Sequence, residues 1–101
     1  MSTATQDPGL LIMISLASGP KHGHAMMRDV EAFAGVHLGP GTLYGALTRL
    51  DEGGLVEPLA ADGRRQPYRL TPAGRKQLAI ETSRWERLAK GIRRILRPAT
   101  E

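Results

Sequence analysis

Residues 41–72 read GTLYGALTRLDEGGLVEPLAADGRRQPYRLTP, and this stretch decides the fold. Leu43, Leu47 and Leu50 recur at i, i+4 and i+7, which is the spacing of one buried helical face. We therefore expect a helix from Gly41 to about Glu52, stopped by the two glycines that follow it.

Two short strands are expected after that helix. Residues 55–59 form an apolar run, and residues 60–66 are polar and contain Asp-Gly, a common hairpin signal. Residues 67–70 then provide the return strand, where Pro67 is tolerated only at the strand start or on an edge. The pattern predicts a β-hairpin.

Two more helices are expected before residue 41. Asp7-Pro8 has the cap-then-proline form of a helix start, and that helix should run to about Ser18. A second helix should span Gly23 to Ala34, with Gly35 as its C-terminal cap. Three helices followed by a hairpin predict a winged helix-turn-helix domain over residues 8–71, a mainly α fold with a small β-hairpin.

A long helix completes the predicted fold. Thr71-Pro72 is another cap-then-proline start, and Pro98 stops a helix that runs to about Arg97. At 1.5 Å per residue this helix is about 39 Å long. We treat residues 72–98 as a separate dimerisation helix.

A heptad-like apolar stripe on this helix predicts a homodimer. The small preceding domain cannot cover the whole stripe, and the first helix is apolar all round and needs a second cover. Glu81 interrupts the stripe, and folding back over the chain's own core is the alternative. The residues predicted to lie in the dimer interface are Leu10, Leu11, Ile14, Leu78, Trp85, Leu88, Ala89, Ile92 and Ile95.

The positive charge lies mostly in the last helix. Residues 1–71 carry 6 basic and 7 acidic side chains, a net charge of −1, whereas residues 72–101 carry 8 basic and 3 acidic ones, a net charge of +5. Binding of nucleic acid by the first part must therefore depend on local clusters rather than on bulk charge. A basic amphipathic helix can also lie on a membrane surface, but we expect no membrane partner.

Several classes of function are not expected. The chain has no cysteine, which removes disulfides, a thiolate zinc site and a cysteine nucleophile. His22, His24 and His37 fit loop and cap positions better than a metal site, and no nucleotide-binding or nucleophile motif is present. No apolar run reaches the ~20 residues that span a bilayer. We expect a cytoplasmic protein that is not an enzyme and needs no cofactor.

The helix over residues 41–52 is the predicted DNA-reading helix, because the second helix of a helix-turn-helix pair enters the major groove. Its outward face is small and uncharged, with one aromatic and one guanidinium at its edges. The alternative is a solvated helix loosened by two glycines. The predicted contact residues are Gly41, Thr42, Tyr44, Gly45, Thr48 and Arg49.

The hairpin tip is the second predicted contact with DNA. Arg64 and Arg65, together with Gln66, could straddle phosphates or enter a minor groove. The alternative is a turn that only aids solubility. Arg69 could contact a phosphate or pair with Glu57 across the hairpin, and the sequence leaves both open.

Three segments together resemble the PadR-type transcriptional regulators. They are His22–Met26, Leu38–Val56 and Gly63–Gly74, and the resemblance extends in order over about residues 10 to 97. The chain departs from the family where His24 replaces a usual Tyr, Gly39 a Ser and Gly45 a Pro, and where Thr48 stands in place of a frequent basic residue. The last two departures fall on the groove face and leave the operator sequence open.

The resemblance implies a homodimeric bacterial repressor of the short branch of that family, acting on a double-stranded DNA operator. It also implies dimerisation through the last helix with help from the first, and ligands near the dimer centre. Trp85 and Ala89 are then candidates to contact a small planar or phenolic effector, although dimer packing alone is the other reading of Trp85. A winged helix that binds protein rather than DNA is the alternative function.

Overall fold

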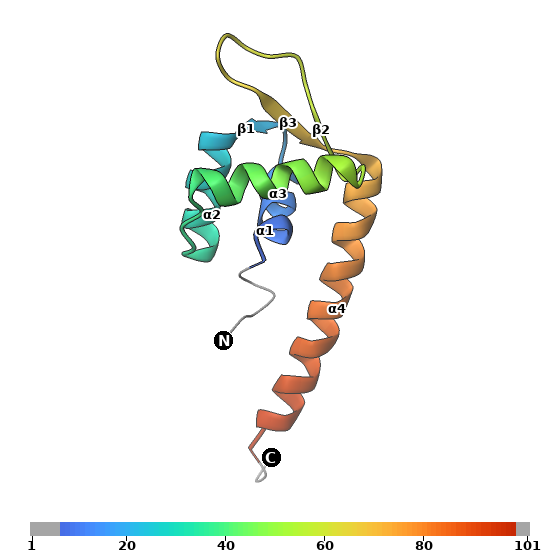
Figure 1. Ribbon diagram of the computed structural model, residues 1–101. Helices are drawn as coiled ribbons and strands as arrows, with labels where there is room; N and C mark the ends of the chain where they lie inside the picture. The colour runs from blue at the N-terminus through green and yellow to red at the C-terminus, as the bar shows by residue number, and fades with distance from the viewer. Residues whose placement is uncertain (1–6, 99–101) are drawn as a thin grey trace.

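The computed structural model describes residues 7–98 and shows four helices and a three-stranded sheet in that part of the chain (Figure 1). The three N-terminal helices pack together beneath the sheet, and the fourth leads away from them. The elements are α1 Pro8–Leu16, β1 Lys21–His22, α2 Gly23–Ala34, α3 Pro40–Glu52, β2 Val56–Pro58, β3 Pro67–Leu70 and α4 Pro72–Leu96.

Side chains that accept hydrogen bonds at the helix starts explain where the helices begin. Asp7 accepts a hydrogen bond from the Gly9 N–H at 3.0 Å, and Thr71 accepts one from the Gly74 N–H at 3.0 Å. Such caps satisfy backbone donors that have no partner inside the helix. Gly35 ends α2 with a φ of 66°, a left-handed conformation that favours glycine. The predicted helix starts at Asp7-Pro8 and Thr71-Pro72 and the predicted cap at Gly35 are confirmed, whereas α3 begins at Pro40, one residue before the predicted Gly41.

The sheet contains a strand that the sequence did not reveal. Its order is β1-β3-β2 with both pairs antiparallel, so β3 is central rather than one of two strands. Lys21 faces Tyr68 and His22 faces Pro67 across the β1–β3 pair. Pro67 is tolerated in the central strand because it occupies the first position.

A polar cluster holds β1 in place. The Lys21 ammonium donates to the Ser15 carbonyl and, at 2.7 Å, to the Ser18 hydroxyl. The buried Ser15 hydroxyl donates to Asp29 on α2 at 2.7 Å. These bonds tie the end of α1 to β1 and α2. A two-residue strand held by distant partners has no periodicity of its own, which is why the pattern missed it.

The core lies between α1, α2, α3 and the sheet. The leucine face of α3 packs inward as its spacing predicts, and Ala46 joins it. The fully buried side chains of largest volume are Ile12, Leu16, Met26, Leu43, Leu47, Val30, Val56 and Ser15. No helix within residues 7–98 combines the length and the apolar character needed to cross a bilayer.

The first turns of α4 are clamped to the hairpin. Gly74 is buried, and a β-carbon at that position would lie 2.1 Å from the Leu55 carbonyl oxygen and 2.6 Å from Leu70. The same Leu55 oxygen accepts a hydrogen bond from the Thr71 N–H at 3.0 Å. Only glycine fits here, because the helix passes directly over a backbone carbonyl.

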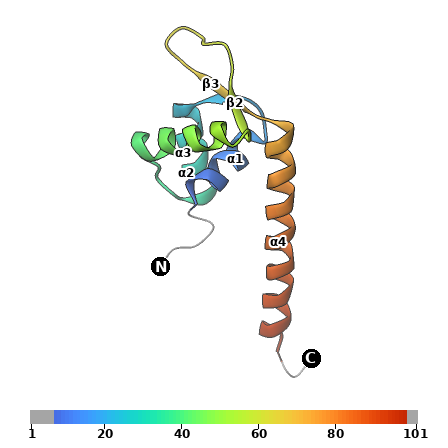
Figure 2. The same cartoon turned by 45° about the vertical axis from the view of Figure 1, so that its right-hand side comes forward.

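The rest of α4 extends beyond the domain (Figure 2). Leu78 still packs against the core, whereas Leu88, Ile92 and Ile95 are 53%, 47% and 81% exposed. The molecule is accordingly elongated, with extents of 61 × 26 × 22 Å. Folding back over its own core, the alternative for the stripe, does not occur for the second half of α4.

Candidate nucleic-acid interface

The outward face of α3 consists of small side chains. Gly41, Thr42 and Thr48 are exposed, and Gly45 is half-buried. An added β-carbon would meet open space at Gly41 and only ordinary contact with Arg49 at Gly45, 3.7 Å away. The Thr48 hydroxyl donates to the Tyr44 carbonyl at 2.9 Å. The methyl of Thr48 and the two glycines therefore leave a shallow surface that a base edge can approach.

Tyr44 connects α3 to the start of α2. A β-carbon on the buried Gly23 would lie 2.4 Å from the Tyr44 hydroxyl, so the tyrosine ring covers that glycine closely. The phenol remains 47% exposed. Tyr44 is thus at the edge of the α3 face, beside the first turn of α2.

Tyr68 of β3 lies in the same region. Partial burial, together with the Asp51 carboxylate and Tyr44, raises the pKa of the Tyr68 hydroxyl above its ordinary value. Tyr68 therefore stays neutral at physiological pH, and it packs against the core behind the α3 face.

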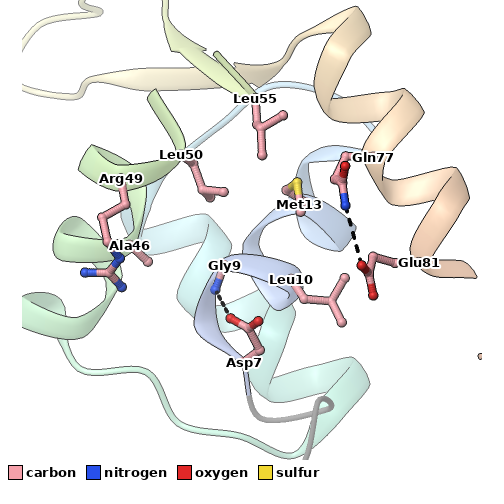
Figure 3. Close-up of a pocket in the computed structure, with 10 residues that line it drawn as sticks. All are labelled: Asp7, Gly9, Leu10, Met13, Ala46, Arg49, Leu50, Leu55, Gln77 and Glu81. Carbon is pink, nitrogen blue, oxygen red and sulfur yellow. Dashed lines mark hydrogen bonds between the residues drawn. The ribbon is translucent and has the colours of Figure 1, made fainter. Parts of the chain in front are cut away.

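Arg49 occupies the other edge of α3 and turns away from the hairpin. Its side chain is exposed and lines a cavity that also contacts α1 and α4 (Figure 3). The sequence analysis predicted that Arg49 contacts DNA from the edge of this face, and that contact stays a prediction; in the structure the side chain lines the cavity. A guanidinium on a side chain of this length can reach toward either side of the helix.

The wing ends in a tight turn. Asp62 and Arg65 exchange backbone hydrogen bonds of 2.9 and 3.0 Å around Gly63 and Arg64. Gly63 has a φ of 64°, as the first central residue of a type II′ turn requires. The two arginines are exposed at this tip, and the wing projects at the end of the molecule opposite to the C-terminal end of α4 (Figure 1).

Gln66 and Arg69, both predicted wing contacts, have partners within the chain. The Gln66 amide donates to the carbonyls of Leu59 and Pro67, which fixes it against the base of the hairpin. Arg69 forms an ion pair with Glu57, its register partner on β2. The sequence left open whether Arg69 contacts a phosphate or pairs with Glu57, and in the structure it pairs with Glu57.

His22 lies beside the wing, although the sequence analysis assigned the histidines only to loop and cap positions. Its Nδ1 accepts a hydrogen bond from the Ala25 N–H at 3.4 Å, so it does cap α2. Its Nε2 also lies 3.5 Å from a guanidinium nitrogen of Arg65. The contact between His22 and Arg65 places the wing beside the start of α2. It follows from the pairing of β1 with β3, which the sequence pattern did not predict. Within residues 7–98, no three His, Cys, Asp or Glu side chains gather in a way that could hold a metal ion.

The predicted dimer residues differ in how much surface they leave free. Leu10 and Leu11 are buried in their own chain, and Leu78 packs on the same core. Ile14, Leu88, Ile92 and Ile95 remain exposed, whereas Trp85 and Ala89 are half-buried. A shallow, open groove runs along the surface of distal α4 and is lined by Arg84, Arg87, Leu88, Gly91, Ile92 and Ile95.

Trp85 belongs to a second hollow, formed by residues of α1, α2 and α4. That hollow has a volume of about 430 Å³ and is lined by Leu10, Leu11, Ile14, Phe33, Ala34 and Trp85. Phe33, on α2, is 44% exposed here. Ala89, the other candidate effector contact, is half-buried but does not line the hollow.

The chain matches known regulators in sequence and in fold. Residues 11–80 match the transcriptional regulator PadR-like family. The chain is 37% identical over 86 residues to the transcriptional regulator Rv3488 of Mycobacterium tuberculosis, a match that covers 82% of this chain and 79% of that protein. It is 47% identical over 85 residues to an uncharacterized 37.1 kDa protein in transposon TN4556 of Streptomyces fradiae.

The transposon match covers 84% of this chain but only 25% of the transposon protein, so the chain spans a quarter of that relative's length. Among solved structures, a PadR family transcription regulator from Clostridium difficile superposes with a TM-score of 0.79 at 24% identity, over 89% of this chain and 98% of that one. This likeness confirms the winged-helix fold. The extent of the family match and the identity to Rv3488 together place the chain in the PadR-like family of transcriptional regulators, which act by binding DNA.

Proposed function

We propose that the protein is a repressor that binds a palindromic operator as a homodimer. Residues 8–71 form the DNA-binding domain and residues 72–98 the dimerisation helix. The observation that carries the proposal is the exposed apolar face of distal α4, far from the wing and from the small face of α3. A two-fold mate would cover that face and present two reading helices together.

The proposed DNA contacts divide between reading and anchoring. The small outward face of α3, with Thr48 at its centre, would read base edges in the major groove. Tyr44, Arg64 and Arg65 would contact phosphates, which position the protein without reading sequence. Arg69 would contact a phosphate only by weakening or breaking its ion pair with Glu57. Gln66 would act mainly by supporting the hairpin.

A gel-shift titration against the DNA upstream of the protein's own gene, at two salt concentrations, tests the proposal. Sequence-dependent binding with a steep salt dependence is expected, because neutralised phosphates release counterions. Salt-insensitive or absent binding would favour a protein-interaction winged helix instead, which the net charge of −1 over residues 1–71 keeps open.

An effector could relieve repression through the hollow beside Trp85. Its lining is mostly apolar, and an indole at its edge suits stacking with a planar aromatic or phenolic ligand. Because α1 and α4 both contribute, an occupant would press on the elements proposed to form the dimer. Quenching of the fluorescence of Trp85, the only tryptophan, would report such binding directly.

Replacing Arg64 and Arg65 together by Ala is expected to weaken DNA binding broadly. The slope of log K against log salt should fall by about 1 for each phosphate that the wing no longer neutralises, while the preference among operator variants persists. The matched control is the double change of Arg93 and Arg94 to Ala, which removes the same charge from distal α4. A wing variant with an unchanged slope would refute the anchoring role.

Replacing Thr48 by Val is expected to change the ranking of operator variants rather than affinity alone. The change should reach about 1–3 kcal/mol at particular base pairs, as expected when one base-edge contact is altered. Thr82→Val is the matched control, because the Thr82 hydroxyl also donates to the carbonyl four residues earlier, but on α4. Arg49→Ala tests the other edge in the same assay, and a uniform loss across variants would mean that only phosphate is contacted.

A further inference from the structure

A cavity of about 340 Å³ lies where α1, α3 and α4 meet, and it shares only Leu10 with the hollow beside Trp85 (Figure 3). Its volume is at the lower end of the range for ligand sites, about 300–1,000 Å³. Its size suits a small molecule with one ring or a short chain. The residues that line it are Asp7, Gly9, Leu10, Met13, Ala46, Arg49, Leu50, Leu55, Gln77 and Glu81.

The wall of the cavity is apolar where the three helices approach one another. Leu10 and Met13 come from α1, and Leu50 and Ala46 from α3, and all four side chains are buried. Leu55 closes the top in the view of Figure 3. This wall would remove the apolar body of a ligand from water, which favours binding in proportion to the area covered.

Glu81 is the least expected member of the lining. It stands on the apolar stripe of α4, where the heptad-like repeat calls for a hydrophobic side chain. The side chain is only 24% exposed. Its carboxylate accepts from Arg84 at 3.1 Å and from the Gln77 amide at 3.5 Å, and Arg84 itself is largely in solvent.

The charges around the cavity favour a positive ligand. The lining contributes two carboxylates, Glu81 and Asp7, and one exposed guanidinium, that of Arg49 on the opposite side. Arg84, which pairs with Glu81, lies outside the lining and is 69% exposed, so solvent and salt screen its charge. No ion pair joins Arg49 to either carboxylate in the described structure. A partly desolvated carboxylate attracts a cation more strongly than one in open water, because the local dielectric is lower and salt screens less.

We propose that this cavity is a binding site for a small organic cation, a protonated amine carried on an aromatic or aliphatic body. The ammonium would donate a hydrogen bond to Glu81, and Asp7 would add to the negative electrostatic potential. The apolar part of the ligand would lie against the leucine and methionine wall. Ala46 and Arg49 belong to α3, so an occupant would touch the reading helix from behind. The site does not depend on DNA binding or on dimerisation.

Calorimetric titration of the full chain without DNA tests the site with two probes of similar shape and opposite charge. These are 2-phenylethylammonium and 3-phenylpropionate. We expect the ammonium to bind and the carboxylate not to bind. In NMR spectra the largest shifts should centre on Gly9, Ala46 and Gln77, rather than on Phe33 and Trp85 of the other hollow.

Glu81→Gln should lower the affinity for the ammonium roughly tenfold or more, since it replaces a charged acceptor by a neutral one. Glu86→Gln makes the same change on the exposed side of α4 and should leave the affinity unchanged. Thermal melts establish that both variants remain folded. No binding of the ammonium, equal binding of the carboxylate, or equal losses in both variants would overturn the proposal.

Discussion

Ile92→Asp is expected to dissociate the proposed dimer and to abolish operator binding. Ile92 lies in the apolar groove of distal α4 and is 47% exposed in the single chain, so its side chain is available to a mate. Around a two-fold axis the change would bring two carboxylates into one apolar interface. Burying an unpaired charge costs several kcal/mol, and in a symmetric dimer both subunits contribute one such charge.

Loss of DNA binding should follow from loss of the dimer. Two reading helices must be held about one DNA turn apart, ~34 Å, to contact both halves of a palindrome. Sedimentation velocity measures the oligomeric state, and a gel shift on the same samples measures operator binding. Leu88→Asp should behave in the same way, because Leu88 lines the same groove.

Ser83→Asp is the matched control for this prediction. It adds the same charge to an exposed position of α4 that does not line the groove. The control should remain dimeric and bind DNA. If Ile92→Asp also stayed dimeric and bound the operator, the face would not be the interface and the proposed dimer would be wrong.

Gly74→Ala is expected to destabilise the folded chain by about 3 kcal/mol or more. The added methyl would overlap the Leu55 carbonyl oxygen, 2.1 Å from the position of the new carbon. A backbone carbonyl cannot rotate aside as a side chain can, and this one also accepts the Thr71 N–H at 3.0 Å. Overpacking of this kind usually costs about 1–3 kcal/mol, to which the broken hydrogen bond adds.

Thermal unfolding followed by circular dichroism measures this effect. A loss of about 3 kcal/mol lowers Tm by more than about 10 °C in a chain of this size. The control is Gly41→Ala, whose methyl meets open space and whose helix propensity improves by up to about 1 kcal/mol. A Gly74 variant as stable as the wild type would show that α4 can shift away from the hairpin without cost.

Much of the fold followed from local pattern. Leu43, Leu47 and Leu50 gave α3 its buried face, and the cap-then-proline pairs at Asp7 and Thr71 marked two helix starts. Each of these signals lies within one or two helical turns of the residues whose structure it predicts. They can therefore be recognised in the sequence without the tertiary fold. The last residues of the helices were predicted less closely, and α1 ends at Leu16 rather than Ser18.

The candidate site was only partly visible in the sequence. The helical wheel identified the outward residues of α3, because burial of the leucines determines which side faces solvent. It could not identify the ion pair of Arg69 with Glu57, because the sequence allowed two partners and only the strand register selected one. The contact between His22 and Arg65 joins residues 43 apart in sequence and had no local signal.

Local sequence pattern was enough to predict the order of the helices, the hairpin, the outward face of α3 and the exposed apolar stripe of α4. Each of these follows from periodicity, from a turn or from a helix cap. The tertiary structure alone decided that β1 pairs with β3, that Gly74 lies against Leu55, and that Glu81 enters a cavity with Arg49. These relations depend on distances between segments far apart in the chain, which exist only once the helices have packed.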